Sequence, residues 1–139
     1  MGLKRFLRKN ASNKQYPLFK LVKSITGFSP VDLSLYRRVF THTSMEKTNA
    51  KGQKINYERL EFLGDAVLNT IVAAHLFESL PQNNEGSLTL MRSKIVRRDF
   101  LNKVGKQLSL IDQLSSNVPI KYYSQNVHGN LFEALVGAL

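Results

Sequence analysis

Three carboxylates stand at helical spacing in the middle of this chain. Glu58, Glu61 and Asp65 occupy positions i, i+3 and i+7 of residues 56–68, so a helix there would present them on one face. Like charges at such spacing destabilise a helix by about 0.2–0.5 kcal/mol per pair. Because apolar residues flank the three acids, the cluster requires a compensating cation or raised pKa values. A magnesium ion is the simplest such cation.

Two segments of the chain resemble a known family. Residues 58–65, Glu-Arg-Leu-Glu-Phe-Leu-Gly-Asp, resemble the signature of the ribonuclease III endonuclease domain. Residues 129–137 resemble its second motif, except that Asn130 stands where the family normally has aspartate. The resemblance implies a site built from two helices, whose metal ligands would be Glu61, Asp65, Asn130 and Glu133. It also implies that Asp65 and Glu133 are the catalytic residues.

The same resemblance gives roles to four residues around this site. Glu58 is implied as a supporting residue near the site and the dimer contact. Glu85 is implied as a further acid, on the rim of the valley that would hold the substrate. Phe62 would insert into a partner subunit, and Gly64 would allow the close approach of helices at that contact. From their residue types alone, Phe62 and Gly64 would be core positions.

The candidate ligands are all oxygen atoms, which favours Mg²⁺, with Mn²⁺ as a substitute. Two such ions about 3.5–4 Å apart activate a water and assist the leaving oxygen of a phosphodiester, so no side-chain nucleophile is required. The chain has no cysteine, which excludes disulfides, thiolate catalysis and cysteine-ligated zinc. His42 and Ser44 lie in a Thr-His-Thr-Ser pattern that the family also carries, and we expect them to serve packing and hydrogen bonding.

The charge of the chain predicts a polyanionic partner. A formal net charge of +10 and a pI near 10.0 are typical of proteins that bind nucleic acid or an anionic membrane. The first acid is Asp32, so residues 1–15 form a basic arm. A membrane-surface role for this arm is the less favoured alternative, because the polar residues 10–15 interrupt its apolar face. No apolar run approaches the roughly 18 residues of a membrane span, so no membrane partner is expected.

Apolar residues recur at spacings of three and four in five segments, which predicts an all-α fold. The expected helices cover about residues 18–26, 31–40, 57–80, 87–100 and 129–139, with Ser87 as the cap of the fourth. The polar segment 48–53 is expected to be a mobile loop. Lys94, Arg97 and Arg98 share one side of the fourth helix and are the candidate RNA-binding residues. The plain alternative is an ordinary solvated helix face.

We interpret the chain as a basic arm, residues 1–15, followed by the catalytic domain of a bacterial-type ribonuclease III over residues 16–139. The implied protein is a cytoplasmic homodimer that hydrolyses double-stranded RNA with Mg²⁺, leaves 5′-phosphate ends, and processes ribosomal and other RNA. The last helix is expected to be truncated at Leu139. The double-stranded-RNA-binding domain that follows in such family members is expected to lie outside this chain.

Two other functions are compatible with parts of the sequence. A ribonuclease III-like domain that has lost cleavage would survive as an RNA-binding or ribosome-associated module, and Asn130 favours it. The retained acids count against it, because a domain without metal gains nothing from a repulsive cluster. A basic helical DNA-binding protein is the weaker alternative, since the chain has no helix-turn-helix signal.

Overall fold

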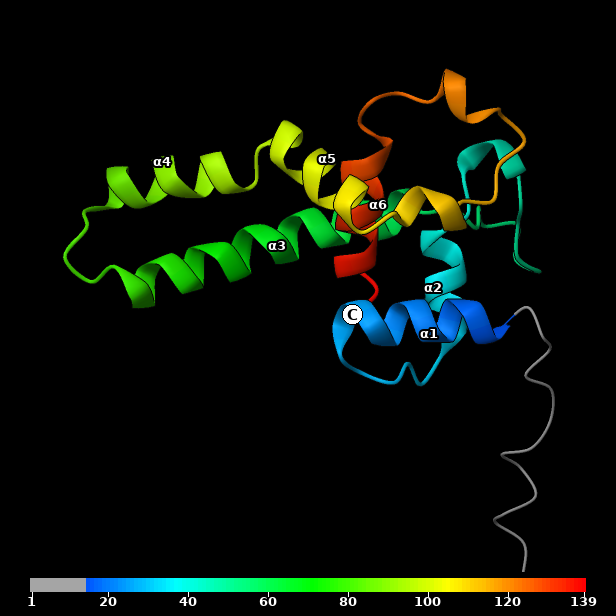
Figure 1. The fold of residues 1–139 in the computed structure, drawn as a ribbon, viewed down its shortest axis with the longest axis horizontal. Helices are drawn as coiled ribbons and strands as arrows, with labels where there is room; N and C mark the ends of the chain where they lie inside the picture. The colour runs from blue at the N-terminus through cyan, green and yellow to red at the C-terminus, as the bar shows by residue number, and fades with distance from the viewer. Residues whose placement is uncertain (1–14) are drawn as a thin grey trace, which may run out of the picture.

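The computed structural model describes residues 15–139 as a helical domain (Figure 1). Its helices are α1 (Gln15–Thr26), α2 (Leu33–Val39), α3 (Glu58–Ser79), α4 (Glu85–Ile95), α5 (Arg98–Gln107) and α6 (Val127–Val136), with three short 3₁₀ turns, η2 (Thr43–Met45), η3 (Leu110–Gln113) and η4 (Ile120–Tyr122). The described residues contain no strand, only two isolated bridges. The all-α prediction is therefore confirmed. The basic arm lies outside the described residues, apart from its last position.

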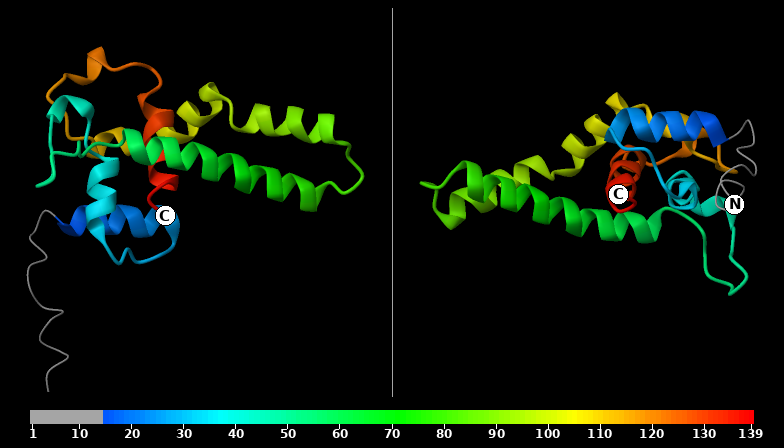
Figure 2. Two further views of the ribbon diagram at one scale, coloured as in Figure 1. Left: turned by 180° about the vertical axis from the view of Figure 1, so that it is seen from behind. Right: turned by 90° about the horizontal axis from the view of Figure 1, so that it is seen from below.

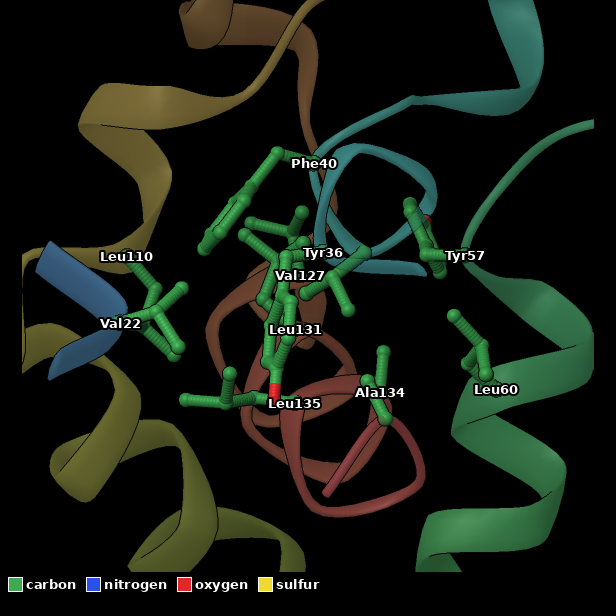
Figure 3. Close-up of a cluster of buried hydrophobic side chains, with 12 residues drawn as sticks. Val22, Tyr36, Phe40, Tyr57, Leu60, Leu110, Val127, Leu131, Ala134 and Leu135 are labelled. Atoms are coloured by element: carbon green, nitrogen blue, oxygen red, sulfur yellow. The ribbon is translucent and has the colours of Figure 1, made fainter. Parts of the chain in front are cut away.

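Helix α6 is the centre of the domain. It lies between α3 and α5 and also contacts α2 and η3 (Figures 1 and 2). Leu131, Ala134 and Leu135 give it a fully buried apolar face. Around them packs a core drawn from the other helices (Figure 3), whose members include Val22, Tyr36, Val39, Phe40, Tyr57, Leu60 and Leu110. A helix apolar on nearly all sides is what the run from residue 131 to residue 139 predicts.

Two glycines set the distance between α3 and α6. A Cβ added at Gly64 of α3 would lie 1.7 Å from the carbonyl oxygen of Glu133. A Cβ added at Gly137, which follows α6, would lie 2.1 Å from the carbonyl oxygen of Leu60. The two backbones therefore touch directly, which is the close approach that only glycine permits. This contact fixes which α3 side chains face α6.

Local signals explain where most helices begin and end. The Asp32 carboxylate accepts a hydrogen bond from the Ser34 N–H at 2.8 Å and caps α2. Gly27 follows α1 with a φ of 76°, the left-handed conformation of a C-terminal glycine cap. Asn84 caps α4 by accepting from the Ser87 N–H at 2.9 Å. The prediction that Ser87 itself is the cap was wrong, because the chain already turns into the helix at Glu85.

The helix predicted over residues 87–100 is in fact two helices. α4 ends at Ile95, and Arg97 has extended backbone angles (φ −65°, ψ 138°) before α5 begins at Arg98. No glycine or proline marks this break, so the apolar periodicity alone conceals it. The break turns α5 onto α6, where Gly105 approaches the carbonyl oxygen of His128. The last helix also begins two residues earlier than predicted, at Val127.

The C-terminal half of α3 and all of α4 form a hairpin that projects away from the core (Figures 1 and 2). It leaves large apolar side chains exposed, among them Ile71, Phe77 and Leu90. By length and composition α3 meets the criteria for a membrane span, contrary to the sequence expectation. Its first two turns, however, carry Glu58, Glu61 and Asp65, and it packs on α6 and α4. We therefore attribute its apolar character to protein contacts.

Candidate active site

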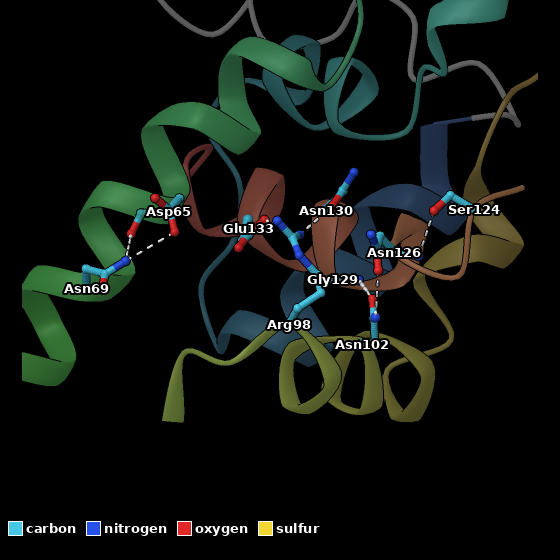
Figure 4. A network of polar contacts seen from close by, with 9 residues as sticks. All are labelled: Asp65, Asn69, Arg98, Asn102, Ser124, Asn126, Gly129, Asn130 and Glu133. Atoms are coloured by element: carbon cyan, nitrogen blue, oxygen red, sulfur yellow. Dashed lines mark hydrogen bonds and ion pairs between the residues drawn. The ribbon is translucent and has the colours of Figure 1, made fainter. Parts of the chain in front are cut away.

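The crossing of α3 and α6 brings four of the predicted site residues together. Glu61 and Asp65 come from α3, and Asn130 and Glu133 come from α6, as predicted. Figure 4 shows Asp65, Asn130 and Glu133. Gly64 lies against the Glu133 backbone, so Asp65, the next residue, lies beside the same part of α6. Glu133 is buried, with 3% of its surface exposed, whereas Asp65 is exposed and the other two are partly buried. The result is an acidic cluster that opens to solvent on its α3 side.

Arg98 is the cation of this cluster. Its Nη1 donates to Asn130 Oδ1 at 2.6 Å and to Glu133 Oε2 at 3.2 Å (Figure 4). The side chain of Arg98 is 47% exposed, whereas that of Glu133 is only 4% exposed. The sequence analysis placed Arg98 on an RNA-binding surface with Lys94 and Arg97. Its contacts in the structure are instead with the acidic site, because α5 starts at Arg98 and faces α6.

The acidic side chains perturb one another. Burial raises the pKa of the Glu61 carboxyl, and the negative charge of Glu133 raises it further. Burial also raises the pKa of Glu133, which the Arg98 guanidinium partly offsets. A carboxyl whose pKa is higher in the folded than in the unfolded protein destabilises the folded protein when it ionises. The protein regains that stability as the pH falls through the folded pKa. At neutral pH this cluster therefore opposes folding, and an added cation would relieve that opposition.

The donor set suits a magnesium ion, but its side chains are engaged by protein partners. Asn69 Nδ2 donates to Asp65 Oδ1 at 3.1 Å, while Arg98 holds Asn130 and Glu133. Among residues 15–139, no three acidic or histidine side chains converge in a metal-holding group. Three carboxylates and one amide oxygen remain the oxygen ligands that Mg²⁺ prefers. Rotation of the Asn69 and Arg98 side chains would free these oxygens, so the residues fit the ion chemically.

Comparison with known proteins agrees with this arrangement. The family model described as "Ribonuclease III domain" matches residues 58–139, a segment that contains both halves of the acidic cluster. The chain belongs to the ribonuclease III family. It is 49% identical over 137 residues to a curated ribonuclease 3 from Flavobacterium psychrophilum. It is 48% identical over 139 residues to one from Zunongwangia profunda.

Each of these ribonuclease III matches covers a different share of this chain than of its relative. They cover 99% and 100% of this chain but 56% and 57% of the two relatives, so the chain spans a little more than half of their length. Among solved structures, the nuclease domain of a ribonuclease III from Campylobacter jejuni has a TM-score of 0.73 at 27% identity. It covers 86% of this chain and 82% of that one, and it shows structural flexibility in a region involved in dimer formation.

The remaining ribonuclease III signature residues differ in exposure and in contacts. Glu58 is exposed at the start of α3, where its carboxylate accepts from Asn56 Nδ2 at 3.1 Å. Phe62 is 82% exposed in this chain. Gly64 is buried in the contact with α6. Gly64 was predicted to allow the close approach of helices at the dimer contact. The close approach in the structure is instead between α3 and α6 of one chain.

Glu85 does not join the acidic cluster within this chain. It stands at the start of α4, after the turn that follows the 22 residues of α3. At about 1.5 Å per residue, α3 spans roughly 30 Å. Glu85 and the acidic cluster therefore lie near opposite ends of α3 (Figure 1). Glu85 lines an apolar groove of about 710 Å³ between α3 and α4 with Phe77, Leu88 and Arg92. Its carboxylate accepts from the Thr89 hydroxyl at 2.8 Å.

Tyr57 is a site residue that the sequence analysis missed. Burial and then the negative charge of Glu61 raise the pKa of its hydroxyl, which also has a hydrogen bond with Asn130. The His42 ring lies 5.9 Å from the Tyr57 ring and stacks on Tyr123 at 5.2 Å. His42 Nδ1 accepts from the Ser44 N–H at 3.1 Å, which agrees with the packing and hydrogen-bonding role predicted for both. The sequence offered a signal for it, because Tyr57 precedes Glu61 by four residues, a spacing that places two side chains on one face of a helix.

The predicted basic surface is not a single surface. Arg97 pairs with Asp99 through two hydrogen bonds of 2.5 and 2.6 Å, and Lys94 lies on α4, before the break. A denser cationic region lies elsewhere. A cavity of about 630 Å³ has twelve lining residues, none of them acidic and five of them basic: Arg37, Arg38, Lys47, Lys54 and Arg59. These residues come from three segments of the chain, which only the fold brings together.

Proposed function

We propose that this chain is the catalytic part of a ribonuclease III that hydrolyses phosphodiester bonds in double-stranded RNA with Mg²⁺ or Mn²⁺ and leaves 5′-phosphate ends. The observation that carries the proposal is the facing of Asp65 and Glu133 across the α3–α6 contact, beside Glu61. We further propose that the protein acts in the cytoplasm, in the processing of ribosomal and other RNA, and has no membrane partner.

Glu61, Asp65, Asn130 and Glu133 would hold the metal ions. When bound, such ions supply an activated water and stabilise the leaving oxygen. Glu133 contributes a carboxylate whose buried position fixes its direction, because α6 is anchored on both sides. Asp65 contributes an exposed carboxylate on the solvent side, where the substrate phosphate arrives. Tyr57 lies beside Asn130, whose side chain partly offsets the rise in the pKa of the Tyr57 hydroxyl. Glu58 would be a supporting acid at the start of α3, where the Asn56 side chain accepts from its N–H and donates to its carboxylate.

The RNA would be held mainly by basic side chains. Affinity for nucleic acid comes largely from Lys and Arg at phosphates, and A-form duplexes are recognised by shape and 2′-hydroxyls. The cationic cavity around Arg37, Lys47 and Lys54 is one candidate for phosphate contact, because five basic residues and no acid line it. Lys94 and Arg97 are exposed and would add contacts along α4 and the start of α5. Glu85 would lie on the rim of the bound duplex.

The direct test is cleavage of a long RNA duplex by this chain. We expect products with 5′-phosphate ends when Mg²⁺ or Mn²⁺ is present and none with a chelator. The same duplex in DNA form should remain uncut, because it lacks the 2′-hydroxyls and the A-form shape. An intact RNA duplex at every metal concentration would contradict the proposal, provided that the protein is folded and binds the RNA.

Assembly as a homodimer is part of this proposal, and Phe62 is its test. The side chain is 82% exposed and borders a shallow cavity with Glu58, Arg59 and Leu63. Phe62→Ala should weaken the dimer by about 3 kcal/mol, the lower end of the range for truncating a buried aromatic. Sedimentation equilibrium measures the change. Tyr122→Ala is the control, since Tyr122 is 68% exposed in η4, outside α3. A monomeric wild type would contradict the prediction.

A second function, an RNA-binding module without cleavage, is favoured by one observation. Asn130 lacks the charge of the usual aspartate, and Arg98 already occupies its oxygen. Three ionised ligands then carry −3 instead of −4 against the charge of two metal ions. The net field favours one tightly held ion, with a second recruited when an RNA phosphate arrives. The same observation thus predicts an active enzyme with a high metal requirement.

Asn130→Asp separates these two functions. We expect the variant to reach half-maximal cleavage at a lower Mg²⁺ concentration than the wild type, because it adds one negative charge to the ligand set. Asn126→Asp is the matched control, since it makes the same change at the start of α6, where Asn126 contacts Asn102. Equal Mg²⁺ dependence would refute the charge argument. Cleavage by the variant alone, at any Mg²⁺ or Mn²⁺ level, would establish the binding module.

A further inference from the structure

One arginine stands where a metal ion would be expected. Arg98 Nη1 donates to the side-chain oxygens of both α6 ligands, Asn130 at 2.6 Å and Glu133 at 3.2 Å. Glu133 is 4% exposed as a side chain, so this guanidinium is its principal charge partner. A buried carboxylate without a partner is strongly unfavourable. The contact therefore stabilises the cluster in the absence of metal.

The position of Arg98 in its own helix is unfavourable. It is the first residue of α5, where the helix dipole favours acidic side chains and disfavours cations. Arg97 precedes it and is neutralised by Asp99, whereas Arg98 has no acidic partner within α5. Among the described residues its side-chain hydrogen bonds go to α6, and its charge also acts on Glu61 of α3. The helix itself thus gives no reason for arginine here, and the acidic cluster does.

We propose that Arg98 is a resident counter-ion of the acidic cluster, which occupies the oxygens of Asn130 and Glu133 until a metal ion displaces it. The inference rests on the proposed function, since the same four residues are taken as metal ligands. Displacement is sterically simple, because the Arg98 side chain is 47% exposed and leads to solvent. Arg98 is then a positioning residue that sets how much metal the site needs.

The charge balance gives the direction of the effect. A guanidinium held against two ligand oxygens repels a second cation that approaches the same oxygens. Asn130 removes one negative charge and Arg98 adds one positive charge, so both make the metal-free cluster less negative. Metal binding must also break the two hydrogen bonds of Arg98. Removing the guanidinium should therefore tighten metal binding while weakening the metal-free fold.

The experiment measures metal binding without RNA. Arg98→Gln removes the charge, Arg98→Lys keeps it, and Arg97→Gln is the matched control that removes one charge from the adjacent arginine. Isothermal titration with Mg²⁺, at fixed ionic strength, should give a dissociation constant for Arg98→Gln about tenfold lower than for Arg97→Gln. Arg98→Lys should stay close to the wild type. Without metal, Arg98→Gln should melt at a lower temperature than Arg97→Gln, and Mg²⁺ should raise its melting temperature more.

The wild type provides a readout that does not depend on the variants. In an arginine-¹⁵N-labelled protein, the guanidinium signal of Arg98 should move toward that of free arginine as Mg²⁺ is added, while that of Arg97 stays in place. An unmoved Arg98 signal at saturating Mg²⁺ would overturn the inference. So would dissociation constants for Arg98→Gln and Arg97→Gln that agree within twofold, or equal tightening by Arg98→Lys.

Failure of the proposed function would look different. If Mg²⁺ binding follows these expectations but duplex RNA stays intact, Arg98 is still the counter-ion of a metal site and the nuclease proposal fails. If the domain cleaves RNA and the two glutamine variants bind Mg²⁺ equally, the nuclease proposal stands and the counter-ion role is wrong.

Discussion

Glu133→Gln and Asp65→Asn are each expected to reduce Mg²⁺-dependent RNA cleavage by about a thousandfold or more, the scale on which charged metal ligands act. Each change replaces a carboxylate by an amide of nearly the same shape, so the ligand charge falls while the helix contacts remain. Binding to duplex RNA should stay within several-fold of the wild type, because phosphate affinity comes mainly from Lys and Arg. Single-turnover cleavage and a filter-binding assay in Ca²⁺ measure the two quantities.

The control for this pair is Asp112→Asn, a carboxylate-to-amide change at an exposed residue of η3 outside the cluster. It should leave both quantities unchanged. Glu133→Gln also removes the charge partner of Arg98, so its folding must be verified by circular dichroism before its activity is interpreted. Cleavage that survives within tenfold in both variants would exclude the proposed ligands. A parallel loss of cleavage and binding would instead mean that the acidic cluster and the RNA-binding surface are not separate.

The helices were predictable because their apolar periodicity is the same signal that packing requires. The face formed by Leu60 and Leu76 is buried as the spacing of α3 indicates, and α6 is buried on nearly every side. The break at Arg97 was not predictable, because residues 88–100 keep helical spacing through it. Only the docking of α5 on α6, where Gly105 meets His128, explains why the chain turns there.

The site was predictable to the extent that it lies on helix faces. Spacings of i, i+4 and i, i+3 bring Glu61 to the side of Asp65, and Asn130 to the side of Glu133, whatever the tertiary structure. The partners of these residues were not predictable in this way. Arg98 reaches the cluster from a segment 32 residues away from Asn130 along the chain, and no periodicity links such positions. The five cations of the second cavity are likewise joined only by the fold.

The hairpin of α3 and α4 illustrates a different limit. Ile71, Phe77 and Leu90 lie in segments with helical apolar spacing, but they are exposed in a single chain. Periodicity reports that a face will be covered and does not say by what.

Gly64→Ala is the substitution expected to damage the fold most. The added Cβ would lie 1.7 Å from the Glu133 carbonyl oxygen and 2.8 Å from the Gly137 nitrogen. Overpacking against side chains typically costs about 1–3 kcal/mol. Here the neighbours are backbone atoms of α6, which cannot move without the core. We therefore expect a loss of at least about 4 kcal/mol in the free energy of unfolding, a large share of the roughly 5–15 kcal/mol of a typical domain.

Urea denaturation of the variant measures this loss, and Gly86→Ala is its matched control. Gly86 lies in the first turn of α4, and the nearest atom to an added Cβ is Asn84 Oδ1 at 3.7 Å. That change should be neutral or stabilise the helix by up to about 1 kcal/mol. If Gly64→Ala lost less than about 1 kcal/mol, α3 and α6 would have to be separable at this contact. The distance between Asp65 and Glu133 would then be adjustable, and the active site could not depend on the glycine contact for its geometry.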